Sequence, residues 1–439
     1  MKKKLIVLIA LVFSVLLINA QEVIFEEYDL DNGLHVILHQ DNSAPVVAVT
    51  TTYHVGAKDE DPKRTGFAHF FEHLLFTGTK NIERGKWDYI VSSYGGSDNA
   101  TTNDDRTYYF TTLPSNNLEL GLWMESERLL HPVIDQQAVD TQNEVVKEEK
   151  RMRVDNSPYG RFLENVKKYL FKNHPYRWTT IGEMEHLDAA TLEEFQQFNK
   201  KFYVPNNAVL SIAGDIDIAA TKKMIQDYFG PIPRGSELNR SFPKEDPITE
   251  TIHAKAYDPN IKIPAIMAAY RTPSFKDKDA YVLDMISNYL SNGKSSKLYK
   301  KLVDEQKMAL QTGAINLSQE DYSMYVVFGL PLGDVSLDTF LAEMDEEIVK
   351  VQNELISERD YQKLQNQFEN QFVNSNSSVL GIAGSLANYY MMFGNTDLIN
   401  KEIDIYRSIT REDIQAVAKK YLNPNQRLVL EYLPETKDE

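Results

Sequence analysis

Apolar and polar residues follow two different periods along this chain. Short runs rich in Val, Ile, Thr and aromatic residues predict β-strands near 24–30, 34–40, 46–54, 105–113 and 206–213. Segments with apolar residues three and four apart predict helices near 66–77, 84–94, 116–129, 136–153, 160–171 and 190–201. Grouped strands with pairs of helices between them are typical of the α+β class.

The second half of the chain repeats the pattern of the first. Residues 191–206 align without gaps with residues 410–425, an offset of 219 residues. Both copies open with a Thr-x-x-Glu/Asp helix cap and end with Pro-Asn before an apolar strand. A repeat of this length indicates a duplicated domain rather than a solenoid unit. We therefore predict two homologous α+β domains, 21–235 and 250–439, joined through the Pro-, Gly- and charge-rich segment 230–249.

The first twenty residues are typical of an export signal. Lys2, Lys3 and Lys4 precede a mostly apolar run from residue 5 to 18, and Ala20 offers a small residue for cleavage. The run is shorter than the roughly 20 residues that a spanning helix prefers, although an uncleaved anchor is the alternative. We predict a signal peptide over 1–20 and a periplasmic or secreted bacterial protein, with no membrane association after cleavage.

Composition excludes several classes of function. The chain has 439 residues, 42% of them hydrophobic, which is enough for two sizeable cores. It has no cysteine, so disulfides, thiolate ligands and a Cys nucleophile are excluded, and it has no G-x-S-x-G elbow. The net charge of −17 argues against nucleic-acid binding.

The most informative stretch is the H-x-x-E-H pentapeptide formed by His69, Glu72 and His73. On a helix the two imidazoles lie on one face, one turn apart, where they can bind one Zn²⁺. Glu72 lies beside them, in reach of a water proton. The alternative is a pair of hydrogen-bonded core histidines with an incidental glutamate.

A catalytic zinc needs a third protein ligand. The charged helix predicted over 136–153 offers Glu144, Glu148 and Glu149. Glutamates of such a helix usually form a solvated face, and composition alone does not choose among the three.

With these residues the chain resembles the inverzincin zinc metallopeptidases, the family of pitrilysin, insulin-degrading enzyme and mitochondrial processing peptidase. The family's third ligand lies about 76 residues after the second His, in an E-R-x-V-V-x-x-E helix. The resemblance implies Glu149 as the ligand, 76 residues after His73. The first Glu of the family's helix, a supporting residue, falls on Gln142 here. The family's fold is two α+β domains packed as a half-clam.

The segment 95–102 is similar to the family's G-G-x-x-N-A-x-T element. In the family the strand after the glycines lines the cleft and pairs with the substrate backbone. The resemblance implies that Asn99 and Ala100 contact substrate. An ordinary hairpin strand after a Gly-Gly turn is the alternative.

The second half has lost the metal motif, because His69, Glu72 and His73 fall on Asn288, Ser291 and Asn292 at the same offset. In the family the inactive domain instead supplies an Arg and a Tyr that contact substrate. Those positions are Val303 and Leu310 here, unless the register differs and Lys300, Lys301 or another residue substitutes.

The resemblance implies a zinc-dependent endopeptidase for extended or unfolded polypeptides. One Zn²⁺ per chain would be held by His69, His73 and Glu149, with Glu72 as the general base. The missing Arg/Tyr pair implies a homologous partner subunit, and a homodimer is less expected because it lacks the pair too. The alternative is a non-catalytic member that acts as a scaffold or a peptide-binding chaperone. Such members typically lose a residue of the H-x-x-E-H motif, which this chain keeps.

Overall fold

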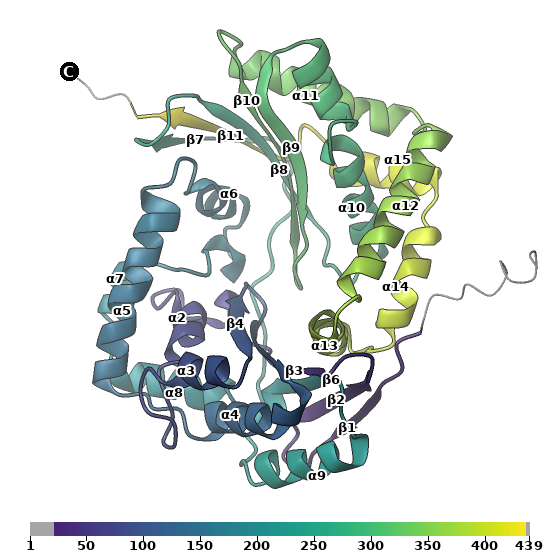
Figure 1. The fold of residues 1–439 in the computed structure, drawn as a ribbon. Helices are drawn as coiled ribbons and strands as arrows, with labels where there is room; N and C mark the ends of the chain where they lie inside the picture. The colour runs from purple at the N-terminus through teal and green to yellow at the C-terminus, as the bar shows by residue number, and fades with distance from the viewer. Residues whose placement is uncertain (1–21, 436–439) are drawn as a thin grey trace, which may run out of the picture.

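Two β-sheets with helices against them build the protein, seen in a computed structural model that describes residues 22–435 (Figure 1). The first sheet has six strands in the order β1-β2-β6-β3-β5-β4, and the second has five in the order β7-β11-β8-β10-β9. The strands are β1 (Glu26–Asp29), β2 (His35–Gln40), β3 (Val46–Tyr53), β4 (Ser97–Thr102), β5 (Thr107–Pro114), β6 (Ala208–Gly214), β7 (Ile252–Asp258), β8 (Ala265–Thr272), β9 (Ala309–Leu317), β10 (Ser323–Pro331) and β11 (Leu428–Pro434).

The helices fall into two sets along the chain, one in each half. The first set is α2 (Phe67–Leu74), α3 (Trp87–Ser93), α4 (Leu118–Leu130), α5 (Gln136–Lys150), α6 (Phe162–Leu170), α7 (Met184–Asp188), α8 (Leu192–Phe202) and α9 (Ile218–Phe229). The second is α10 (Lys278–Ser291), α11 (Leu337–Asn353), α12 (Glu358–Ser375), α13 (Val379–Asn388), α14 (Leu398–Arg407) and α15 (Arg411–Tyr421). No helix among residues 22–435 is long and apolar enough to span a membrane.

The two sheets share one topology. The order β2-β6-β3-β5-β4 corresponds strand by strand to β7-β11-β8-β10-β9. The first pair in each series is parallel, and the other pairs are antiparallel. The prediction of two homologous α+β domains is therefore confirmed. The segment between α9 and β7, which has neither helix nor strand, connects them.

Most predicted elements lie within a few residues of the observed ones, and the differences have local causes. Helix α2 ends at Leu74, earlier than predicted, because the Thr77 hydroxyl donates to the Leu74 carbonyl and Gly78 then takes a positive φ of 152°. Strand β4 and helices α7 and α9 were absent from the hydropathy prediction. The predicted signal peptide lies outside the described residues.

The repeated helix cap is present in both halves and gives a first testable prediction. Thr191 and Glu194 exchange hydrogen bonds at the start of α8, and Thr410 and Asp413 do so at the start of α15. Thr191→Ala and Thr410→Ala should each lower the free energy of unfolding by about 1 kcal/mol, measured in urea. Thr141→Ala, at an exposed position within α5, is the control and should change it little.

If only one of the two substitutions lowered the free energy of unfolding, the two caps would not be equivalent.

The domains are held together by a helix and by a buried ion cluster. Helix α13 of the second half packs on β2, β3 and β6 of the first sheet (Figure 1). Lys58, which is 2% exposed, lies 3.0 Å from Asp105 of its own domain, 2.7 Å from Glu320 and 3.0 Å from Asp321 of the other. Because a buried ammonium is costly without partners, this cluster fixes how the domains sit against one another.

Candidate metal centre

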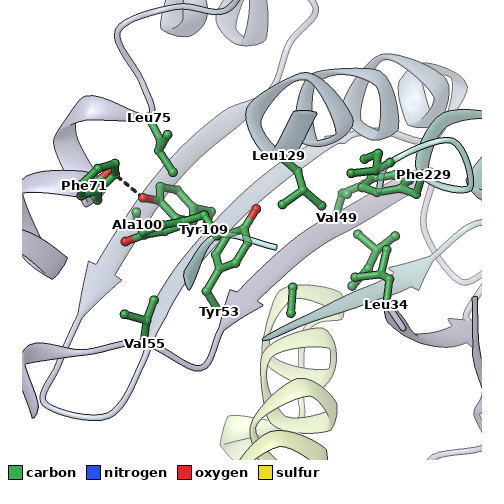
Figure 2. Packing of buried hydrophobic residues seen from close by; sticks show 14 of the residues in the cluster. Leu34, Val49, Tyr53, Val55, Phe71, Leu75, Ala100, Tyr109, Leu129 and Phe229 are labelled. Atoms are coloured by element: carbon green, nitrogen blue, oxygen red, sulfur yellow. Dashed lines mark hydrogen bonds between the residues drawn. The ribbon is translucent and has the colours of Figure 1, made fainter. Parts of the chain in front are cut away.

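Helix α2 presents the polar trio because its other residues are held against the first sheet. Gly66, with a φ of 96°, begins the helix, and the buried Glu60 carboxylate accepts hydrogen bonds from the Gly66 and Ala68 N–H groups. The Tyr109 hydroxyl of β5 donates to the Phe71 carbonyl at 2.8 Å (Figure 2). Phe67, Phe70 and Phe71 pack into the core, so the face with His69, Glu72 and His73 points away from it.

Helix α5 brings Glu149 to the two histidines. Its Oε2 lies 3.1 Å from Nε2 of His73 and 3.5 Å from Nε2 of His69. Ligand atoms about 2.1 Å from a tetrahedral zinc lie about 3.4 Å from one another. The Glu149 oxygen therefore already lies at the spacing from each histidine that a shared zinc requires, and all three ligand atoms lie within 4.8 Å of one another.

The structure shows which of the three candidate glutamates can be the third metal ligand. The carboxylate of Glu148 is 58% exposed and pairs with Arg151, and that of Glu144 is 72% exposed and pairs with Lys147. Only Glu149 of the three faces the histidines. The other carboxylate oxygen of Glu149 pairs with Arg153 at 2.7 Å, which orients the group.

Electrostatics favour the protonation states that a zinc site needs. Burial, with His73 nearby, lowers the pKa of His69 to about 4, so its ring is neutral at pH 7. The neighbouring His73 imidazole, 3.1 Å away, lowers the pKa of Glu149, which stays ionised. Burial raises the pKa of Glu72, which makes it a better proton acceptor than an exposed glutamate.

The residues fit a zinc ion on two further observations. Two imidazoles and a carboxylate are a ligand set that catalytic zinc uses. Nδ1 of His69 and Oε2 of Glu149 are buried with no hydrogen-bond partner among the described residues. A bound cation would satisfy the carboxylate oxygen, which otherwise costs desolvation energy.

The predicted substrate residues lie beside this centre. Asn99 and Gln142 line a pocket of about 590 Å³ together with Glu72 and His73. Ala100 is buried, and its N–H donates a hydrogen bond to Oδ1 of Asn99 at 2.8 Å. Strand β4 is the edge strand of its sheet, so one side of its backbone has no neighbouring strand. The substrate roles of Asn99 and Ala100 and the supporting role of Gln142 stay predictions.

Sequence reasoning missed two arginines of the centre. Arg153 follows Glu149 by one helical turn, so the i, i+4 spacing could have indicated the pair. Arg106 follows β4, and its charge partly offsets the rise that burial gives to the pKa of Glu72. Nothing in the local sequence indicates this contact, because it depends on how β4 packs on α2.

The second domain has no comparable group in its described residues. Asn288 and Asn292 hydrogen-bond to each other at 2.6 Å, and the Ser291 hydroxyl donates to the Ala314 carbonyl. Val303 packs against the second core and Leu310 is 53% exposed. Lys301, one of the possible substitutes for the missing arginine, pairs with glutamates of α11 and is not free to replace it.

The ligand assignment predicts a difference between neighbouring glutamates. Glu149→Gln should weaken zinc binding by more than the roughly 10- to 100-fold that loss of an outer-shell partner costs, because a neutral amide replaces a charged direct ligand. Glu144→Gln and Glu148→Gln are the matched controls and should bind zinc as the wild type does. Competition with a chromophoric chelator measures the affinity. Loss of zinc in Glu148→Gln alone would place the ligand one residue earlier.

Comparison with known proteins gives two family matches and a relative that covers most of the chain. The family model described as Insulinase (Peptidase family M16) matches residues 35–183, and that of the Peptidase M16 inactive domain matches residues 189–368. The zinc protease PqqE of Helicobacter pylori is 29% identical over 407 residues, 91% of each chain.

Solved structures show the same fold. A protease from Helicobacter pylori superposes with a TM-score of 0.88 at 27% identity, covering 93% of this chain and 99% of that one. The periplasmic protease PqqL from Escherichia coli superposes with a TM-score of 0.76 at 20% identity, covering 93% of this chain and 47% of that one. The chain belongs to peptidase family M16, in which its relatives are zinc proteases.

Proposed function

We propose that this protein is a zinc-dependent endopeptidase that cleaves extended or unfolded polypeptides. The observation that carries the proposal is the convergence of His69, His73 and Glu149, with Glu72 on the same helix face. The likeness to zinc proteases of the same family supports it. Export by a signal peptide to the periplasm or the medium is part of the proposal.

His69, His73 and Glu149 would hold the zinc, which when bound supplies Lewis acidity and lowers the pKa of water to about 7. Glu72 accepts a proton from the attacking water and passes it to the leaving amine. Its partial burial keeps the carboxylate poorly solvated, and Arg106 and Thr102 stabilise its charged form.

The unpaired edge of strand β4 supports the proposed preference of the enzyme for extended polypeptide substrates. Its free edge can hydrogen-bond a substrate main chain as an added strand, which recognises backbone rather than sequence. The Ala100 N–H would exchange its bond to Asn99 for one to substrate. A folded substrate has no free strand to offer and should be a poor one.

We further propose that the chain is the catalytic subunit of a heterodimer. Val303 and Leu310 offer no side-chain hydrogen-bond donor, so a homologous partner would supply the Arg/Tyr pair. The periplasmic protease PqqL holds this domain pair in 47% of its own length, so its chain is longer than one such pair.

The test measures zinc content and hydrolysis of reduced, unfolded casein by the mature chain with and without a homologous partner. The expected result is about one zinc per chain and hydrolysis that stops when a chelator is added. Zinc binding without hydrolysis in either preparation would instead favour a non-catalytic peptide-binding member of the family.

A further inference from the structure

A second polar cavity lies away from the metal, where the two domains meet. It has a volume of about 280 Å³. The loop after β4 contributes Asn103 and Asp105. Helices α10, α13 and α14 and the helical turn 389–393 form most of the remaining wall, with Phe275 and Ser318. The mechanism described above uses none of these residues.

Two acidic side chains line this cavity without a cationic partner. Asp284 accepts hydrogen bonds from Asn316 at 2.8 Å and from the Tyr406 hydroxyl at 3.3 Å, and Glu402 accepts one from Tyr389 at 2.6 Å. No ion pair within residues 22–435 includes Asp284 or Glu402. Burial raises the pKa of Asp284 to about 6 and also raises that of Glu402. A buried carboxylate that lacks a counter-charge is costly, and an entering cation would offset that cost.

Other charges near the cavity are already neutralised. Asp105 on the rim lies 3.0 Å from the Lys58 ammonium. Lys276, next to the lining residue Phe275, pairs with Glu320 at 3.0 Å. The cavity therefore keeps a net negative lining that comes from Asp284 and Glu402.

Aromatic side chains make up much of the remaining wall. Tyr281, Tyr389 and Tyr406 line it together with Phe275 and Phe393. Aromatic faces attract organic cations, and the attraction grows when both partners are desolvated. A divalent metal ion would instead require several oxygen ligands in close convergence, and the described residues show no such group here.

Tyr281 gives an independent indication of a ligand. The residue is 8% exposed and lines the cavity, and its hydroxyl, which is accessible rather than buried, forms no hydrogen bond with any residue in the described part of the chain. Glu402 and Asp284 both act on its ionisation, which places the hydroxyl in their field. A hydroxyl held in this position can accept a hydrogen bond from a bound ammonium or guanidinium group.

The cavity is close to the edge strand that would hold substrate. Asn103 directly follows Thr102, the last residue of β4, and Thr102 lies beside Glu72. Three residues of strand separate Ala100 from Asn103, about 10 Å. On the adjacent strand Tyr109 points toward α2, whereas the hydroxyl of Tyr108 lies near Gly384 of α13. Alternate side chains of an added strand would likewise face α2 and α13, and the cavity lies on the α13 side.

We propose that this cavity binds the cationic side chain of a lysine or arginine in a polypeptide held on β4, with Asp284 and Glu402 as counter-charges and Tyr281 as a hydrogen-bond acceptor. This inference rests on the proposed peptidase function. It makes the enzyme selective for a basic residue a few positions from the scissile bond, through a pocket separate from the metal centre.

Direct binding tests the pocket without requiring turnover. The probes are fluorescent ten-residue peptides of one neutral sequence, in which a single lysine is moved through successive positions, and leucine replaces it in the reference peptide. Fluorescence anisotropy with the zinc-loaded Glu72→Gln protein gives each dissociation constant. One lysine position should bind about tenfold more tightly than the leucine reference.

The variants assign that gain to the cavity. Asp284→Asn combined with Glu402→Gln should remove the tenfold gain and leave the affinity for the leucine peptide unchanged. Tyr281→Phe, which removes only the hydroxyl, should reduce the gain in affinity about threefold. If the double variant does not fold, this single variant tests whether the lysine binds in the cavity. Asp404→Asn, an exposed acid on the same helix as Glu402, is the control and should keep the full gain.

The outcomes separate this proposal from the peptidase function. Equal affinity for all peptides, or a gain that survives in the cavity variants, would overturn the pocket. Binding of spermidine without any lysine preference would assign the cavity to free amines and would overturn it as well. A lysine preference in binding, with no hydrolysis by the wild-type chain either alone or with a homologous partner, would leave the pocket standing and remove the peptidase function.

Discussion

Replacing Glu72 by glutamine is expected to leave zinc binding intact and to abolish nearly all peptide hydrolysis. Glu72 lies on the ligand face of α2 but is not one of the three converging side chains. The substitution keeps the shape of the side chain and removes its ability to accept a proton. Loss of a general base costs on the order of 10²–10⁴-fold in rate. The rate of hydrolysis of unfolded casein and the zinc content are measured on the same preparation. The first tests the loss of activity, and the second tests the retention of zinc.

The comparison that isolates this role uses a second isosteric substitution. Glu83→Gln changes an exposed glutamate that follows α2 and should retain both zinc and activity. If Glu72→Gln hydrolyses casein within a few-fold of the wild-type rate, another group takes the proton. If it loses the zinc, Glu72 acts by supporting the ligand helix rather than as a base.

Much of the metal centre is predictable from sequence because its first part is local. The positions of His69, Glu72 and His73 on one helix follow from the spacing alone, and α2 needs only its apolar residues to bury the opposite face. The duplication is equally visible, since the capping threonines Thr191 and Thr410 recur at a fixed offset.

The third ligand is harder to predict because it depends on the rotation of a second helix. Glu144, Glu148 and Glu149 have the same chemistry, and only the packing of α5 against α2 turns Glu149 toward the histidines. The family resemblance pointed to Glu149 from a spacing, and the structure gives the physical reason.

Contacts between the domains could not be predicted from sequence at all. Lys58 finds Glu320 and Asp321 more than 260 residues away, and nothing near Lys58 marks it as buried. In the sequence, Asp284 and Glu402 are indistinguishable from ordinary polar positions of two amphipathic helices. Their isolation from any cation becomes visible only when α10 and α14 are packed against the loop after β4.

The isolated chain is expected to be a slow peptidase that a homologous partner accelerates by about 10²–10³-fold. That factor is the typical effect of one preorganised hydrogen-bond donor at a developing oxyanion. The second domain offers no such donor at the two matching positions, because Val303 is packed against its core and Leu310 is aliphatic. Self-association would bring another copy of the same two residues and could not restore the donors.

The test compares casein hydrolysis by this chain alone, by the product of any adjacent homologous gene alone, and by the two together. The mixture should be far more active than the sum of its parts and should elute as a complex in size-exclusion chromatography. Glu72→Gln in this chain should silence the complex, because the base resides here even when the donors reside in the partner. Full activity of the isolated chain, unchanged by any partner, would rule out complementation and would mean that another residue of this chain replaces the missing arginine and tyrosine.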